Sequence, residues 1–247
     1  MSQEIFAKRL NDLANMAYRR GIPTYTDYLD LNQQTEYIEY ITSNKMPPVN
    51  TILNGGLLLV EGEDFLERKM ACFYPKETDE YLSEAYVEFP ICIIEIRPAN
   101  KKFADTLTHR DFLGAIMNLG IERHLIGDIL VKDNMAYVFA VKKMAEFVCD
   151  NLIKIKHTTV HASICEQCDF SYVPAFKEEK GSVASERIDA IISFAFNMSR
   201  NEASAYISAG KVFVNAKETV SKSHTLKYGD IVSVRGMGRF VFDEVVS

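Results

Sequence analysis

The stretch N-M-S-R-N-E-A-S-A-Y-I-S-A-G-K-V-F-V-N, residues 197–215, carries the signals that divide the C-terminal part of the chain into a helix and a strand. Ser199, with Glu202 three residues later, is typical of a capping box and predicts a helix that begins at Ser199. Gly210 predicts its end. The alternation that follows predicts a short strand in which Val212 and Val214 point inward while Lys211, Phe213 and Asn215 point outward.

The predicted helix has a packing side and a polar side. At about 100° per residue, Arg200, Ser204 and Ser208 share one side, whereas Ala203, Ile207 and Gly210 turn toward another. The free N–H groups and the dipole at a helix N-terminus favour anions. We therefore interpret the polar side as a surface that a phosphate backbone could approach closely.

The residues on either side of this stretch complete a small module. Residues 185–196 predict a preceding helix with an apolar side of Ile188, Ile191, Ile192 and Ala195, and residues 231–242 predict a last pair of strands. Residues 182–247 hold eight Lys or Arg against seven Asp or Glu, whereas residues 1–181 hold 20 against 27. Bulk charge is therefore not the binding signal in this module.

The middle of the chain predicts a second domain. Strands are expected at 86–96, 127–131, 135–141 and 153–164, and helices at 108–120 and 142–152, with Thr108 and Asp111 in capping-box spacing. The order β-α-β-β-α-β is that of ferredoxin-like and RRM-like domains. Tyr137 and Phe139 share one face of the sheet, where they either stack on RNA bases or belong to the core or ordinary surface.

The N-terminal part predicts an α/β domain. Ile5, Leu10, Leu13 and Met16 recur at helical spacing, a second helix follows Asp30, and residues 51–62 read as a strand, a glycine turn and another strand. The sequence thus predicts an α+β fold of three small domains: 1–80, 81–165 and 182–247, with a linker between the last two.

Composition narrows the class of protein. Apolar residues make up 47% and charged residues 25% of the 247-residue chain, as in an ordinary soluble protein. The apolar runs are too short to span a membrane, and the N-terminus lacks the apolar core of a signal peptide, so we expect a cytoplasmic protein that is a monomer when free. Five irregularly spaced cysteines predict reduced thiols rather than a disulfide framework.

Residues 186–236 resemble the S4 RNA-binding domain, whose pattern is Arg-Leu-Asp, Ser-Arg, Ala, Gly-x-Val-x-Val-Asn and Gly-Asp. The matching residues here are Arg187, Ile188, Asp189, Ser199, Arg200, Ala203, Gly210, Val212, Val214, Asn215, Gly229 and Asp230. The resemblance implies RNA contacts at Arg187, Ser199, Arg200, Lys211, Asn215, Lys217, Arg235 and Arg239. The alternative for each cation is a solvated surface charge, and Asn215 is alternatively a turn residue.

The whole layout is similar to the YlmH family of bacteria. The features that carry this resemblance are T-D-Y-L-D-L-N-Q-Q, N-G-G followed by Glu67–Lys69, residues 108–130, and the ending V-R-G-M-G-R-F. The family implies a ribosome-associated factor that binds the large ribosomal subunit, 23S rRNA and peptidyl-tRNA during rescue of stalled nascent chains. It needs neither metal nor cofactor, and it also has an older association with cell division.

Enzyme readings rest on weaker motifs, so we expect no catalytic site. His109–Asp111 read H-R-D, but the other protein-kinase motifs are missing, and a capped helix start is favoured. The set His157, His161, Cys165 and Cys168 contains four competent zinc ligands, yet residues four apart on a strand lie about 13 Å apart, and no metal is expected. The two alternatives that stay open are an RNA-modifying enzyme acting on rRNA or tRNA and a cell-division adaptor.

Overall fold

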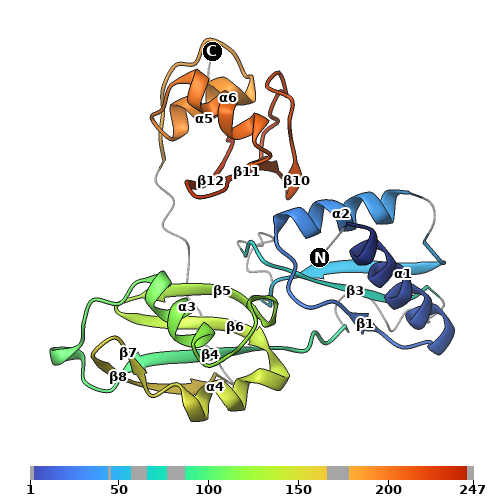
Figure 1. The fold of residues 1–247 in the computed structure, drawn as a ribbon. Helices are drawn as coiled ribbons and strands as arrows, with labels where there is room; N and C mark the ends of the chain where they lie inside the picture. The colour runs from blue at the N-terminus through green and yellow to red at the C-terminus, as the bar shows by residue number, and fades with distance from the viewer. Residues whose placement is uncertain (1–2, 44–45, 57–65, 77–86, 166–177, 244–247) are drawn as a thin grey trace. The chain divides into compact units, whose positions relative to one another are not determined.

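The computed structural model describes residues 3–43, 46–56, 66–76, 87–165 and 178–243 (Figure 1). The chain divides into two compact units, one comprising residues 1–30 and 43–172 and the other residues 31–42 and 173–247. Three separate sheets with helices packed on them are present in the described part, which confirms the predicted α+β class. The boundaries predicted for three domains stay predictions.

The N-terminal part of the first unit is a small antiparallel sheet with one helix packed on it. The helix is α1 (Gln3–Arg20), and the strands are β1 (Thr24–Tyr25), β2 (Val49–Asn54) and β3 (Met70–Pro75), in the order β1-β3-β2. A strand predicted within residues 57–62 lies outside the described residues.

The buried stripe of α1 differs from the predicted one. It consists of Phe6, Leu10, Ala14 and Ala17, whereas the side chains of Ile5 and Met16 are exposed by 59% and 37%. The prediction that Ile5 and Met16 belong to the packing side is therefore wrong. The spacing of the observed stripe forms one continuous row on the helix, in which two alanines allow close approach to the sheet.

The rest of the first unit has the predicted order of elements. It consists of β4 (Ile91–Pro98), α3 (His109–Met117), β5 (Ile126–Lys132), β6 (Met135–Val141), α4 (Ala145–Asn151) and β8 (Thr158–Ile164), with the short 3-10 helices η2 (Lys101–Phe103), η3 (Arg123–Leu125) and η4 (Lys142–Met144) in the connections. The sheet order is β5-β6-β4-β8-β7, entirely antiparallel, and α3 and α4 cover the same face (Figure 1). Phe112, Ile116 and Val148 of the helices share a buried core with Ile94 and Val138 of the sheet.

The predicted closing strand at 153–164 is instead a tight hairpin. β7 (Lys154–Ile155) pairs with β8, and Lys156 between them adopts a positive φ of 51°. The chain therefore reverses at Lys156 and His157, which an extended strand would not allow.

The second face of this sheet is covered at Phe139. Tyr28, Leu66 and Met70 bury Phe139 and Val141, and the side chains of Tyr28 and Phe139 are 0% exposed. Gly127 permits this packing, because a Cβ atom there would lie 2.7 Å from the Tyr28 ring and 3.0 Å from Phe139. Of the two alternatives for Phe139, the core reading holds, and its ring is unavailable to an RNA base.

The second unit contains two helices and a four-stranded antiparallel sheet. The helices α5 (Ile188–Ala195) and α6 (Arg200–Ser208) pack on β9 (Val212–Val214), β10 (Lys217–Glu218), β11 (Ile231–Val234) and β12 (Gly238–Val241), in the order β10-β9-β11-β12. α2 (Leu31–Thr42) also belongs to this unit. The Thr35 hydroxyl of α2 donates to the carbonyl oxygen of Ala216 and accepts from the N–H of Glu218, each at 3.0 Å.

Three further expectations can be compared with the structure. Phe213 was predicted to point outward, but it is fully buried on the face opposite Val212 and Val214, so that prediction is wrong.

Cys72, Cys92 and Cys149 are free thiols, whereas Cys165 is disulfide-bonded, which corrects the expectation of reduced thiols at that position. Within the described ranges, no helix has the length and apolarity needed to cross a bilayer.

The packing around Gly127 gives a stability prediction. Gly127→Ala should lower the free energy of unfolding by about 1–3 kcal/mol, because the added methyl group overpacks the Tyr28 ring. Gly114→Ala is the matched control, since nothing lies within 4 Å of its added Cβ atom and alanine favours the α3 helix. Urea unfolding followed by circular dichroism measures both. Equal stabilities of the two variants would contradict the packing described at Phe139.

Candidate nucleic-acid interface

A buried carboxylate joins two of the predicted RNA-contacting arginines. Asp189 accepts from Arg187 Nε and Nη2 at 3.1 and 3.2 Å, and from Arg200 Nη2 at 2.9 Å. The Asp189 side chain is 6% exposed, whereas those of Arg187 and Arg200 are 45% and 49% exposed. We call these three residues the Asp189 bracket. It fixes two guanidinium groups at the start of α5 and α6 and leaves part of each facing outward.

The ionised form of Asp189 is favoured in the folded unit. Burial acts to raise its pKa, but the hydrogen bonds and positive charges of Arg187 and Arg200 outweigh burial and lower the pKa below the usual value for aspartate. The sequence did contain a signal for this role, because a carboxylate within the apolar run at 188–195 must be paired when it is buried.

The predicted capping box at the start of α6 is present. Ser199 N and Oγ both donate to Glu202 Oε2 at 2.8 Å, and Glu202 N donates to Ser199 Oγ at 3.2 Å. The hydrogen bonds from Ser199 hold the pKa of Glu202 below its ordinary value. The Glu202 carboxylate thus lies at the N-terminal end of α6, where the sequence predicted the approach of an RNA phosphate. The Ser199 hydroxyl is already hydrogen-bonded within the capping box.

The predicted faces and end of α6 agree with the structure. Ala203 and Ile207 are fully buried, Arg200 and Ser208 are exposed, and Ser204 is half-buried. Gly210 has a φ of +63°, and the N–H groups of Gly210 and Lys211 donate to the carbonyl oxygens of Ile207 and Tyr206. This is a Schellman end that requires the left-handed conformation at Gly210.

Asn215 has a structural role in the described hairpin. Asn215 and Ala216 adopt φ values of 49° and 62°, as in a type I′ turn between β9 and β10. Its side-chain amide donates to Asp230 at 2.8 Å, and its oxygen accepts from the N–H of Ile231 at 3.0 Å. Contact of Asn215 with RNA stays a prediction beside this role.

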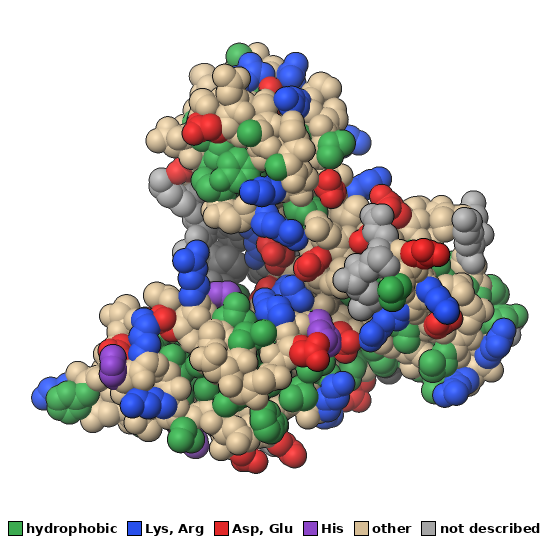
Figure 2. Space-filling view, in the orientation of Figure 1, with side chains coloured by type: hydrophobic (Ala, Val, Ile, Leu, Met, Phe, Trp, Pro, Cys, Tyr) green, Lys and Arg blue, Asp and Glu red, His purple; other side chains and the backbone are tan. Residues whose placement is uncertain are grey.

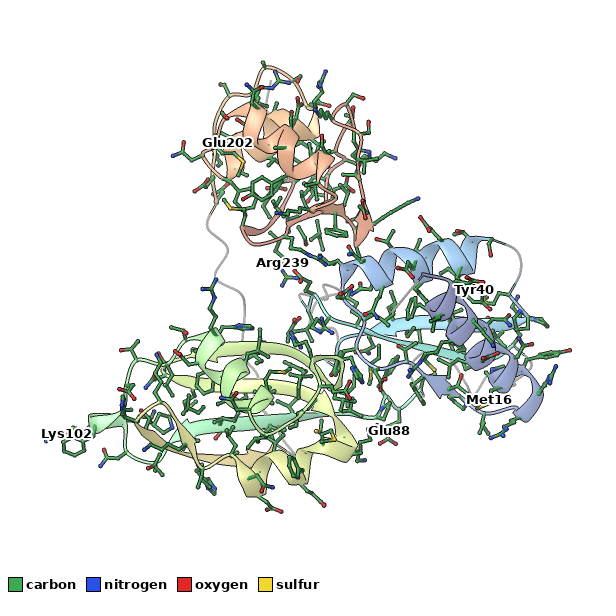
Figure 3. All side chains as sticks on the ribbon, in the orientation of Figure 1. Met16, Tyr40, Glu88, Lys102, Glu202 and Arg239 are labelled. Atoms are coloured by element: carbon green, nitrogen blue, oxygen red, sulfur yellow. The ribbon has the colours of Figure 1, made fainter. Side chains whose placement is uncertain are left out.

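The remaining predicted cations are exposed but distributed over the sheet. Lys211 and Arg235 are neighbours, since Arg235 N donates to Lys211 O at 2.8 Å, and their charged groups lie over the rings of Tyr206 and Phe213. Lys217 lies on β10 and Arg239 on β12, at opposite edges of the sheet (Arg239 is labelled in Figure 3). Basic and acidic side chains are interspersed on the visible face (Figure 2). The six predicted cations therefore include two close pairs, Arg187 with Arg200 and Lys211 with Arg235. The other two, Lys217 and Arg239, lie apart from these pairs and from each other.

The H-R-D sequence at the start of α3 has the expected structural role. Asp111 Oδ2 accepts from Thr108 N and Oγ1 and from Lys156 Nζ, the last at 2.7 Å. The hydrogen bonds from Lys156 and Thr108 lower the pKa of Asp111 to about 2. The pKa of His109 is lowered, first by burial and then by the charges of Arg123 and Arg110. Asp111 is thus committed to holding the start of the helix.

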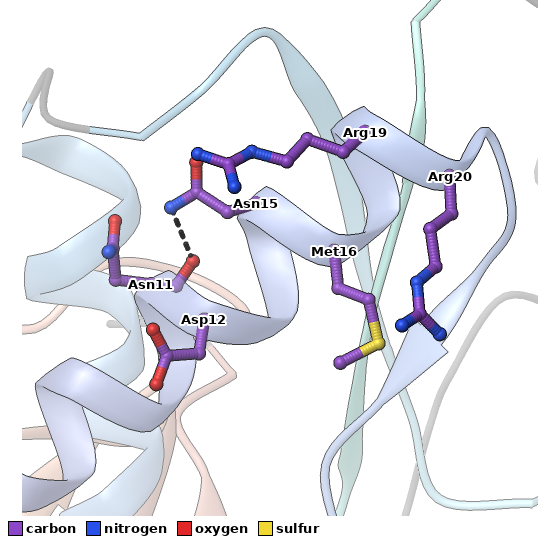
Figure 4. A pocket seen from close by; sticks show the side chains of 6 residues that line it. All are labelled: Asn11, Asp12, Asn15, Met16, Arg19 and Arg20. Atoms are coloured by element: carbon purple, nitrogen blue, oxygen red, sulfur yellow. Dashed lines mark hydrogen bonds between the residues drawn. The ribbon is translucent and has the colours of Figure 1, made fainter.

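The predicted zinc-ligand set and a surface depression on α1 are the other candidate sites. His157 lies in the β7–β8 turn and His161 on β8, Cys165 is disulfide-bonded, and Cys168 lies outside the described residues. No cluster of three or more His, Cys, Asp or Glu able to hold a metal ion is found in the described part of the chain. A surface depression on α1 is lined by six of its side chains (Figure 4): Asn11, Asp12, Asn15, Met16, Arg19 and Arg20. These six residues include no nucleophile paired with a base.

Comparison with known proteins finds one family, one relative and one solved structure to which the chain is similar. The family "Putative RNA-binding domain in YlmH" matches residues 85–169. A Bacillus subtilis (strain 168) protein named "Ribosome-associated protein quality control protein P2" is 28% identical over 216 residues, which are 87% of this chain and 78% of that protein. A solved structure, "Cell division protein ylmH from Streptococcus pneumoniae", is 24% identical, with a TM-score of 0.49, and covers 66% of this chain and 90% of that chain. The resemblance to the YlmH family is confirmed, and neither the matched family nor the B. subtilis relative is named as an enzyme.

The Asp189 bracket predicts a pH-dependent stability of the second unit. Because the pKa of Asp189 is lowered on folding, its contribution is present above the unfolded pKa of about 3.9 and is lost as pH falls through the folded value. Asp189→Asn should lower the free energy of unfolding by about 1–3 kcal/mol at neutral pH and flatten its decline below about pH 4. Urea unfolding between about pH 3 and 7 tests this. Parallel curves for the wild type and the variant would show that the bracket has no such role.

Proposed function

We propose that this YlmH-like chain is a non-enzymatic RNA-binding factor of the large ribosomal subunit, which engages 23S rRNA and peptidyl-tRNA during rescue of stalled nascent chains. The proposal includes three domains, with an RRM-like domain at residues 81–165 and an S4 domain at residues 182–247. The observation that carries it is the Asp189 bracket, which presents two half-exposed guanidinium groups from a fixed position. The name of the B. subtilis relative supports association with the ribosome.

Arginine is suited to this role. Its planar guanidinium carries five donors, so Arg187 and Arg200 can bind Asp189 with some N–H groups and offer the others to phosphate oxygens. Lys211 and Arg235 supply a second basic pair. Phosphate contacts of this kind position a module on RNA, and base or shape contacts elsewhere supply specificity.

The predicted residues differ in the role that we propose for them. Arg187, Arg200, Lys211, Lys217, Arg235 and Arg239 contact phosphate, whereas Ser199 and Asn215 shape the surface through the capping box and the β9–β10 turn. The side-chain oxygen and amide of Asn215 and the hydroxyl of Ser199 already have partners within the unit. A cytoplasmic location and a monomeric free state belong to the same proposal.

Co-sedimentation with purified large ribosomal subunits tests this function. The full chain should pellet with the subunits at low salt and be released as salt rises, because phosphate binding displaces counterions. Arg200→Ala should weaken binding to all RNA sequences alike and reduce the salt slope by about one. Lys8→Ala on the exposed surface of α1 is the matched charge control.

Two results would count against the proposal. One is recovery of the wild-type chain only in ribosome-free fractions at low salt, with stalled complexes present. The other is equal binding by the Arg200→Ala and Lys8→Ala variants, which would make Arg200 an ordinary surface charge. If deletion of the protein from a strain abolishes one rRNA or tRNA modification, that result would instead support an RNA-modifying enzyme.

A further inference from the structure

One end of the β4–β8 sheet presents an exposed aromatic ring beside basic residues. η2 holds Lys101, Lys102 and Phe103, and the Phe103 side chain is 79% exposed, with Lys102 Nζ 5.8 Å from its ring centroid. His157 of the adjacent β7–β8 turn has a side chain that is 92% exposed. We call these four residues the basic tip. Figure 3 shows Lys102 at this end of the sheet.

The loop that carries Phe103 is fixed at both ends. Ala99 N donates to Thr159 O at 2.9 Å, and Asn100 caps η2 by accepting from Lys102 N at 3.0 Å. After the ring, Asp105 N donates to Thr158 Oγ1 at 2.8 Å, and the Asn134 side chain accepts from Leu107 N and donates to Asp105 O. A fixed loop holds Phe103 away from the core.

Two of the acidic groups near the basic tip, Asp105 and Asp111, are engaged with other groups. The Asp105 carboxylate accepts from His157 N and from the Thr158 hydroxyl, and Asp111 holds Lys156. Asp133 of the β5–β6 turn, a third acidic residue at this end, is exposed. Within the described residues, the ion pairs at this end involve Lys156 and His157, and none involves Lys101 or Lys102.

Another aromatic ring of the same domain, Phe139, is buried. Phe139 lies on the face of the sheet opposite α3 and α4, and Tyr28, Leu66 and Met70 bury it completely. The Phe139 ring is therefore not available for stacking on a base. Phe103 offers an exposed ring with Lys102 near it and Lys101 in the same 3-10 helix, and this combination suits bases and phosphates of an unpaired strand.

We propose that the basic tip binds an unpaired segment of RNA, with one base stacked on Phe103 and the adjoining phosphates on Lys101 and Lys102. This inference deepens the proposed RNA-binding function and rests on it. It places the RNA contact of the domain matched at residues 85–169 at its loop end rather than on its sheet face.

Binding of the full chain to a fluorescein-labelled, unstructured RNA of about 12 nucleotides tests the proposal by fluorescence anisotropy. Phe103→Ala should weaken binding about tenfold or more, whereas Phe103→Tyr should bind like the wild type, because a tyrosine ring still stacks. Lys101→Ala together with Lys102→Ala should reduce the slope of log affinity against log salt by about 1.4.

Matched controls lie at the opposite end of the domain. Phe147→Ala removes a partly exposed ring of α4, and Lys142→Ala with Lys143→Ala removes two charges of η4. Both controls should bind the RNA like the wild type. Equal weakening by the Phe103→Ala and Phe147→Ala variants would overturn the proposal. The proposal would also be overturned if the Phe103→Ala variant lost binding to polyglutamate but kept its RNA binding. That result would indicate an acidic protein partner.

Co-sedimentation with large subunits, run on the same variants, separates this proposal from the proposed function. If the Phe103 variants leave RNA binding unchanged while Arg200→Ala releases the chain from the subunit, the basic tip proposal fails and the proposed function stands. If the chain never joins the subunit but still needs Phe103 to bind unpaired RNA, the proposed function fails and the basic tip proposal stands.

Discussion

The carboxylate of Asp189, held between Arg187 and Arg200, is the interaction on which the candidate RNA surface depends. A buried carboxylate is costly unless it is paired and hydrogen-bonded, and here two guanidinium groups supply three hydrogen bonds. Because Arg187 caps α5 and Arg200 begins α6, the same contact ties the starts of both helices together. The exposed parts of the two arginines therefore have a fixed separation, which a pair of lysines on flexible stems would not give.

A second constraint acts in the first unit, where Gly127 permits Tyr28 to pack against Phe139. Side chains packed on each face of the β4–β8 sheet stabilise it, and they cover Phe139 on the face opposite the helices. The β-α-β-β-α-β order is present although Phe139 is buried, so fold and binding mode must be argued separately. Its exposed loop ends, which core packing leaves free to vary, become the places to look for a site.

Local signals account for what the sequence predicted well. The capping boxes at Thr108 and Ser199 and the left-handed glycine at Gly210 depend on residues a few positions apart, and all are present. Phe213 was mispredicted because strand alternation assigns a face but cannot show that both faces are covered. The reversal at Lys156 was missed because no glycine, asparagine or proline marks it. For the site, the family pattern supplied Arg187, Asp189 and Arg200, but their mutual contact needed the packing of two helices.

The charge arrangement also limits how the second unit can bind RNA. Glu202 occupies the N-terminal end of α6 and offsets the attraction of that helix end for an anion. Residues 182–247 carry a small excess of positive charge, eight Lys or Arg against seven Asp or Glu, so a broad electrostatic field is weak. Affinity must then come from a few placed contacts, and several such contacts on one RNA add through effective concentration. A chain that combines the Asp189 bracket with a second, separately placed contact can thus bind a large RNA assembly without being basic itself.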